Sequence, residues 1–155
     1  TRKSSSPTGQ KVEEVRPVGP DGHDPRRDTL VTAARLVAAP TRSELLAVVR
    51  DQAPRSLSAT WVAVVDVEQG TTLVAGAGAP TDGWLGAFVH GASTAASLSG
   101  NDSTQSDVIW AGLEGCGLAL VAGRDRIAWR DRERRQVDAL ADIVALRWVE
   151  LPDDL

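Results

Sequence analysis

The chain has 155 residues, of which 42% are hydrophobic and 25% charged, and its formal net charge at pH 7 is −4. This composition is typical of an ordinary globular domain and excludes collagen-like and largely disordered chains. Because phosphate backbones and anionic lipids repel a chain of net negative charge, we expect neither a nucleic acid nor a membrane as a partner.

The first 27 residues are predicted to be a flexible linker. They contain four prolines and a run of serines, and their only aliphatic side chains are Val12, Val15 and Val18. Such a stretch buries too little surface to offset the entropy lost on ordering it. We therefore place one domain at residues 28–151 and a short tail at 152–155. Since the sequence contains no methionine, we expect the domain to be part of a longer protein with neighbouring or output domains.

Two helices are predicted to follow the linker. Apolar residues at three- and four-residue spacing indicate a first helix that starts at the N-cap Asp28 and ends before Pro40. The second helix starts at a capping box formed by Thr41 and Glu44 and ends before Pro54.

A first β-hairpin is predicted after the helices. Residues 59–67 are rich in β-branched and aromatic side chains, and a break at Gly70 separates them from a second strand at 71–77. Apolar side chains alternate onto both faces of the first strand, so we expect both faces of the sheet to be covered.

The segment between the two predicted hairpins, residues 78–106, is the least regular part of the domain. Asp82 is expected to cap a short helix in which Trp84 stacks over Phe88. Residues 91–106 are mostly small or polar and are predicted to form a mobile loop. A loop of this length within a compact domain indicates either a functional lid or a wrong assignment of elements.

The second predicted hairpin joins the apolar runs 107–113 and 116–122. The two-residue link Glu114–Gly115 between them is typical of a tight turn.

A final helix is predicted from the N-cap Asp131 to Pro152. The arginines between residues 124 and 135 alternate with acidic residues, which favours a solvated, salt-bridged helix start over a nucleic-acid patch. Apolar side chains cover more than one face of this helix, so it needs more than one packing partner, and we predict a homodimer. The candidate interface residues are Val137, Leu140, Val144 and Trp148.

The order helix, helix, hairpin, variable segment, hairpin, helix resembles that of GAF domains, small sensory modules of the GAF/PAS-like superfamily. Residues 44–49 and 59–66 are similar to the second helix and first strand of that family. Residues 117–126 and 129–141 are similar to its last central strand and closing helix. The related PAS fold is the nearest alternative, but its strand order fits the terminal helices less well.

The resemblance implies an α/β (α+β) fold in which a central antiparallel β-sheet carries the N- and C-terminal helices on one face. The opposite face, roofed by residues 78–106, would hold a ligand cavity. The implied function is regulatory: the domain would bind a small molecule or a protein partner and relay that event through its terminal helices within a cytoplasmic signalling or transcription-regulating protein. The candidate pocket residues are Trp61, Trp84, Phe88, His90, Trp110 and Cys116.

The cofactor stays unknown, because the family's motifs for cyclic nucleotides, bilins and methionine-sulfoxide reduction are absent. His90 could bind haem iron, as in a haem-based sensor, or could be an ordinary surface histidine. The lone Cys116 suggests a reducing compartment, and its apolar neighbours favour a buried thiol over a redox-active one. Without a catalytic or metal-binding motif, we expect no enzyme and no metal site. A ligand-free scaffold for dimerisation or docking is the alternative to a sensor.

Overall fold

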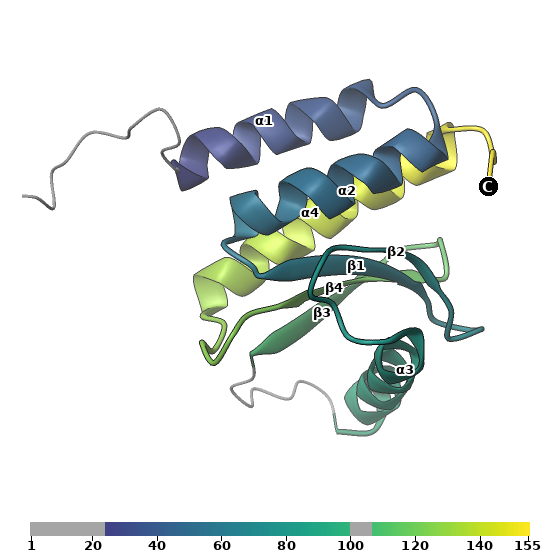
Figure 1. Ribbon diagram of the computed structural model, residues 1–155. Helices are drawn as coiled ribbons and strands as arrows, with labels where there is room; N and C mark the ends of the chain where they lie inside the picture. Colours follow the sequence, from purple (N-terminus) through teal and green to yellow (C-terminus); the bar gives the residue numbers. More distant parts are fainter. Residues whose placement is uncertain (1–23, 100–106) are drawn as a thin grey trace, which may run out of the picture.

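The computed structural model describes residues 24–99 and 107–155. The elements in chain order are α1 (Pro25–Ala38), α2 (Arg42–Leu57), β1 (Trp61–Asp66), β2 (Thr72–Ala75), α3 (Asp82–Ser99), β3 (Val108–Leu113), β4 (Leu118–Gly123) and α4 (Asp131–Glu150). Within these residues the strands form one antiparallel sheet in the order β2-β1-β4-β3. Helices α1, α2 and α4 lie on one face of the sheet and α3 lies on the other (Figure 1). This arrangement confirms the predicted fold class.

The side chains of β1 alternate between the two faces, as its sequence predicts. Val62 and Val64 belong to the large apolar cluster under α1, α2 and α4, which we call the inner cluster. Trp61, Ala63 and Val65 belong to a smaller cluster under α3, which we call the outer cluster. Every residue from 61 to 65 is buried, so both faces of the central strand are covered.

The two hairpins differ in their connections. The first is confirmed, with a bulge where the pairing passes from Val64 to Val65. In the second, Leu113 pairs with Leu118, so the link has four residues rather than the predicted two. The link contains Gly115 and Gly117, both with positive φ. Glycine adopts this conformation without the steric penalty of a side chain, which allows the longer turn.

The start of α1 differs from the prediction. Its N-cap is Asp24, whose Oδ1 accepts a hydrogen bond of 3.1 Å from the backbone N–H of Arg26, and Pro25 is the first helical residue. Proline is favoured there because its fixed φ suits the first turn, where its missing N–H costs nothing. Asp28 therefore lies in the first turn and is not the cap. The predicted linker loses its last residues to α1, and residues 1–23 lie outside the described residues.

Helix α2 begins as predicted but ends later. The Thr41 hydroxyl accepts the backbone N–H of Glu44 at 3.1 Å. The helix then continues through Pro54 to Leu57. An interior proline costs about 3 kcal/mol, and this cost is offset because the turn containing it buries Ala53 and Leu57 in the inner cluster.

Helix α4 starts one residue earlier than its predicted cap implies. Arg130 occupies the N-cap position, and Asp131 is the first helical residue. The carboxylate of Glu133 accepts the backbone N–H of Arg130 at 2.9 Å, which satisfies a donor at the helix start.

The predicted loop at 91–106 is wrong over residues 91–99, which continue α3 to Ser99. Alanine, which occurs three times in this stretch, is the strongest helix former. Extending a helix already anchored on the sheet also requires no new nucleation. Residues 100–106 of the predicted loop lie outside the described residues.

Candidate functional site

The outer cluster lies between the sheet and α3. Its buried members are Trp61, Ala63, Val65, Leu85, Val89, Ala119 and Val121, and Val67, Ala75, Ala79, Phe88, Val108 and Trp110 pack around them. Leu85 and Val89 of α3 have no exposed surface, so this part of the expected roof packs directly on the strands. The predicted helix at the start of this segment is present, and over residues 91–99 the expected mobile lid is a continuation of that helix.

The backbone of helix α3 lies directly against the backbone of the β1–β2 turn. A Cβ added to Gly86 would lie 2.5 Å from the carbonyl oxygen of Gly70. Real Cβ atoms essentially never come this close, so glycine at position 86 permits the contact. The position of α3 is therefore set by backbone packing as well as by its two buried aliphatic side chains.

Two aromatic rings form the exposed part of this site. The rings of Trp84 and Phe88 stack as predicted, with centroids 5.2 Å apart and planes 6° from parallel. Trp84 is 45% exposed, whereas Phe88 is half-buried against the outer cluster. Half-buried Trp110 packs against the same cluster from β3. Among the predicted pocket residues, the structure thus groups Trp61, Phe88 and Trp110, with Trp84 stacked outside them.

The two remaining pocket candidates lie elsewhere. His90 is exposed on α3, and its carbonyl accepts the Thr94 hydroxyl at 2.9 Å. Cys116 lies at the β3–β4 turn and packs against the inner cluster, with its Sγ 3.7 Å from the carbonyl oxygen of Ala145 in α4. The prediction that Cys116 lines the pocket beneath α3 is therefore wrong, because the turn places it on the side of the sheet that carries α1, α2 and α4.

The surroundings of Cys116 do not activate it. Burial raises the pKa of the thiol above its ordinary value and outweighs the opposite influence of Arg42. The thiol lines a hollow of about 310 Å³ that is also bordered by Asp66 and Glu68. The Asp66 carboxylate already accepts the backbone N–H groups of Glu68 and Gln69, at 3.0 and 2.9 Å. This hollow is bordered by the β1–β2 and β3–β4 turns, and none of Trp61, Trp84, Phe88 and Trp110 lines it.

The four predicted interface residues of α4 lie inside the monomer. Val137 and Val144 have no exposed surface, and Leu140 and Trp148 are 3% and 9% exposed. All four belong to the inner cluster, because the stripe that they form faces the sheet and α2. The terminal helices instead expose Leu30 and Val37 from α1 and Leu146 and Val149 from α4. The homodimer itself stays a prediction.

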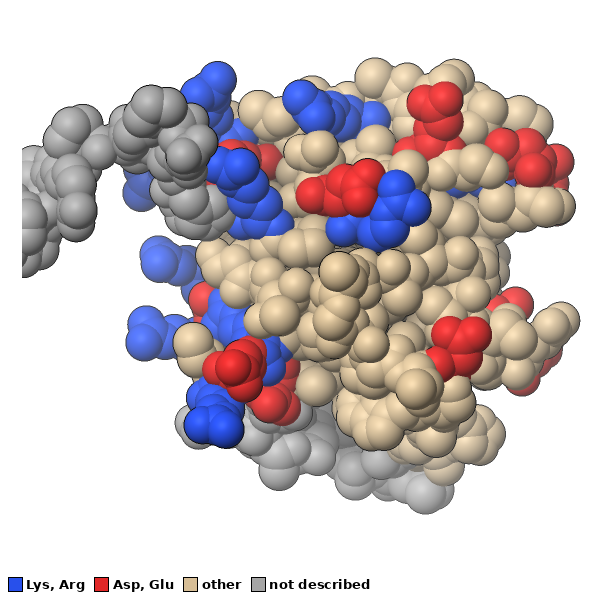
Figure 2. All heavy atoms as spheres, viewed as in Figure 1, with Lys and Arg blue, Asp and Glu red and all other residues tan. Residues whose placement is uncertain are grey.

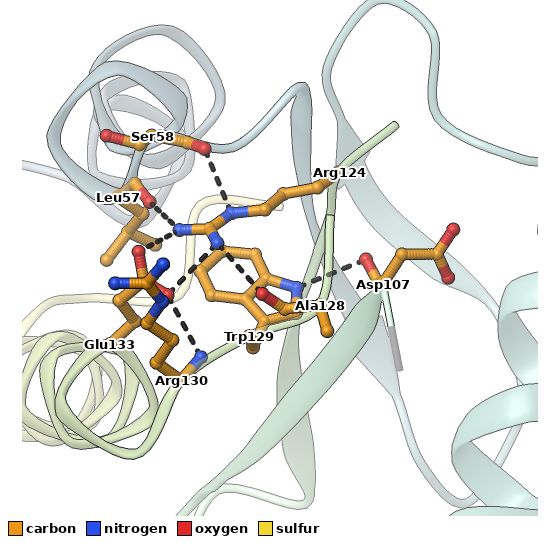
Figure 3. A network of polar contacts seen from close by, with 8 residues as sticks. All are labelled: Leu57, Ser58, Asp107, Arg124, Ala128, Trp129, Arg130 and Glu133. Carbon is orange, nitrogen blue, oxygen red and sulfur yellow. Dashed lines mark hydrogen bonds and ion pairs between the residues drawn. The ribbon is translucent and has the colours of Figure 1, made fainter. Parts of the chain in front are cut away.

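A buried polar network at the start of α4 was not predicted. The side chain of Arg124, which follows β4, is only 6% exposed, and its guanidinium carbon lies 3.8 Å from the centre of the Trp129 ring. Figure 3 shows this guanidinium directed at the Glu133 carboxylate and at three backbone carbonyls. One nitrogen, Nη1, donates to Glu133 Oε1 at 3.0 Å and to the carbonyl oxygen of Ala128 at 3.3 Å.

The same guanidinium reaches the end of α2. Its Nε donates to the carbonyl oxygen of Ser58 at 3.1 Å, and its Nη2 donates to that of Leu57 at 3.4 Å. Chiefly through its hydrogen bond to Glu133, Arg124 also holds the pKa of that carboxyl below its ordinary value. The sequence suggests a solvated basic cluster, but the structure buries its first arginine. Its partners at positions 57 and 58 are too distant in sequence for a local motif to reveal the contact.

Within residues 24–99 and 107–155, no three His, Cys, Asp or Glu side chains gather into a group that could hold a metal ion. In the same ranges, no helix combines the length and the apolar character needed to cross a bilayer.

Comparisons with protein-family models, with curated proteins and with solved structures found no match to this chain. The resemblance to GAF domains therefore stays a prediction, and the function is argued from the site itself.

Proposed function

We propose that this protein is a regulatory, GAF-like module that binds a ligand or partner at the face covered by α3 and relays the event through α1, α2 and α4. The observation that carries the proposal is the stacked pair of Trp84, 45% exposed, and Phe88, which packs into the outer cluster. A ligand on Trp84 would thus be one ring away from the cluster on which α3 rests. We place the module in a reducing cytoplasm, on the basis of its single cysteine.

The surface over α3 favours an uncharged ligand. Asp82 is the only Asp, Glu, Lys or Arg in α3, and Figure 2 shows a largely uncharged surface over this helix, with most charges over the other helices. Flat aromatic faces bind planar or apolar groups by offset stacking. An apolar or aromatic small molecule, or an apolar peptide side chain, therefore fits better than a phosphate-bearing nucleotide. We assign the site a binding role and no catalytic one.

A ligand screen tests this proposal. The panel contains uncharged aromatic metabolites, cyclic nucleotides, haem and peptides with aromatic side chains, and the measurements are thermal unfolding and the indole N–H resonances of the five tryptophans. A ligand at 100 times its Kd should add about 2.7 kcal/mol to the free energy of unfolding. The Trp84 resonance should shift most, and the Trp148 resonance on the far side of the sheet least.

Two variants make the screen specific. Trp84→Ala should abolish the stabilisation, whereas Leu146→Ala, a truncation of another exposed apolar side chain, on α4, should preserve it. Stabilisation that survives Trp84→Ala would place the ligand elsewhere. A panel without any stabilising member would remove the support for a small-molecule sensor.

A scaffold function is the second candidate, and the exposed apolar residues of the terminal helices favour it. Leu146 and Val149 of α4 are 70% and 67% exposed, at a spacing that puts both on one side of the helix. Sedimentation velocity should then report a dimer that Leu146→Asp dissociates. Leu155→Asp, which changes an exposed leucine outside the helix, is the matched control. A monomer at all concentrations would exclude a homodimeric scaffold.

A further inference from the structure

One end of the sheet connects the outer cluster to the chain segment that carries Arg124. The indole of Trp61, an outer-cluster residue, lies against Gly123, the last residue of β4. A Cβ at Gly123 would overlap that ring at Cε2 and Cζ2. The carbonyl oxygen of Gly123 also accepts the backbone N–H of Thr60 at 2.8 Å. Because packed groups in such contact move together, a displacement of Trp61 displaces the end of β4.

Arg124, the residue that follows Gly123, is held by contacts of both its backbone and its side chain. The carbonyl oxygen of Asp107, directly before β3, accepts the backbone N–H of Arg124 at 2.8 Å and Nε1–H of Trp129 at 3.1 Å. The Trp129 ring in turn stacks on the Arg124 guanidinium. Two bonds to one carbonyl thus hold the arginine and its aromatic partner in a single position.

The guanidinium of Arg124 then joins two helix ends. The last carbonyls of a helix have no partner within the helix, and Arg124 donates to Leu57 and Ser58 at the end of α2. Its other partner, Glu133, lies in the first turn of α4, where a negative charge is favoured. The planar guanidinium can reach all these acceptors at once, which the single ammonium of a lysine cannot do.

We propose that the Arg124 cluster, consisting of Arg124, Trp129 and Glu133, couples the outer cluster to the ends of α2 and α4. A change in the packing of α3 on Trp61 moves Gly123 and hence the guanidinium, and this loosens or tightens both helix ends together. The proposal rests on the proposed function for the origin of the input, since it describes how an event at the α3 face would reach the terminal helices. The coupling itself is a property of the unliganded protein.

A ligand-free experiment tests the coupling. Val89→Ala removes two methyl groups of α3 from the outer cluster without touching Arg124. Amide hydrogen exchange is measured in the last turn of α2 and, at the first turn of α4, at the hydrogen-bonded amides of Arg130 and Arg134. The reference is the buried amides of β1, which report global unfolding. In an otherwise unchanged protein, Val89→Ala should accelerate exchange in both turns about five- to tenfold, the range of a modest coupling energy. In an Arg124→Lys background, adding Val89→Ala should leave the exchange of these turns unchanged.

A second arginine provides the matched control. The Arg42 guanidinium lies 4.4 Å from the centre of the Trp148 ring, and its Nε donates to the Trp148 carbonyl at 3.0 Å, at the opposite end of α4. Arg42→Lys should preserve the response to Val89→Ala. If Arg124→Lys fails to fold, Glu133→Gln, which keeps the shape of the side chain and removes its charge, takes its place.

Two results would overturn the coupling. One is an equal response to Val89→Ala in the Arg124→Lys and unmodified backgrounds, and the other is no response in either. Because no ligand is added, a negative ligand screen leaves this test intact. A failed coupling test likewise leaves binding at Trp84 standing.

Discussion

The two faces of the sheet are built from the same strands but supported differently. The inner face carries three helices and a continuous cluster that extends from Leu36 in α1 to Trp148 in α4. The outer face carries α3, held by Leu85 and Val89 and by the close contact at Gly86. The difference suggests a division of roles, in which the inner face supplies most of the stability and the outer face is the adjustable layer.

The largest effect is expected from a pair of neighbouring valines. Val64 and Val65 are both fully buried on β1, but Val64 faces the inner cluster and Val65 the outer one. Losing two methyl groups costs about 1.6 kcal/mol in transfer free energy alone. A rigid cavity adds to this cost, so Val64→Ala should cost about 3 kcal/mol. Val65→Ala should stay near about 1.6 kcal/mol, because α3 can settle into the space.

Urea unfolding of the two valine variants measures the difference. Equal costs would mean that the outer face is as rigidly packed as the inner one. That result would contradict the assignment of α3 as the adjustable layer.

The next largest effect concerns the closeness of α3 to the sheet. Gly86→Ala places a methyl group against the backbone of Gly70 and should cost about 2 kcal/mol, as overpacking commonly does. The control is Gly91→Ala on the same helix, where a Cβ meets no atom within 4 Å. This change should stabilise the protein by up to about 1 kcal/mol, the difference in helix propensity between the two residues. Thermal unfolding of both variants tests the contact, and a neutral Gly86→Ala would show that α3 can move away freely.

The sequence was sufficient for those features that depend on neighbours along the chain. Alternating apolar residues predicted that Trp61 and Val65 face one side of β1 and that Val62 and Val64 face the other, because side chains in a strand have a period of two. The four-residue spacing of Trp84 and Phe88 likewise predicted their stacking. In both cases, local geometry alone decides the contact.

The sequence was insufficient where distant contacts decide the structure. Pro54 normally ends a helix, but burial of the turn around it in the inner cluster outweighs that preference. Small residues after His90 suggested a loop, although α3 continues through them. The burial of Arg124 depends on carbonyls at positions 57 and 58, which no spacing rule connects to residue 124. The candidate binding surface was therefore partly predictable, and the coupling cluster was not.

A smaller effect is expected at the surface of the outer face. Trp84 is 45% exposed and stacks on Phe88, and a stacked aromatic pair contributes about 0.5 to 1.5 kcal/mol beyond area burial. Trp84→Ala should therefore cost about 1 kcal/mol in urea unfolding, and Trp84→Phe about half of that. A much larger loss would make Trp84 a structural residue of the outer layer, which would weaken its assignment as a ligand contact.

The last and smallest effect appears only in acid, at the junction of the two faces. The hydrogen bond and charge of Arg124 hold the pKa of Glu133 below its ordinary value. A carboxyl with a lowered pKa in the folded state stabilises the protein above its unfolded pKa, and this contribution is lost as the pH falls through the folded value. The free energy of unfolding should thus decline at acidic pH, and Glu133→Gln should flatten that decline.

The control is Glu150→Gln, which removes a carboxylate that is 64% exposed and paired with Arg147 at 2.7 Å. Because water screens an exposed ion pair, this change should have only a slight effect on the decline at acidic pH. If the free energy of unfolding of both variants declines equally at acidic pH, the Arg124 cluster is no tighter than a surface ion pair. A cluster that loose could not transmit a displacement from the outer face to the helices of the inner face.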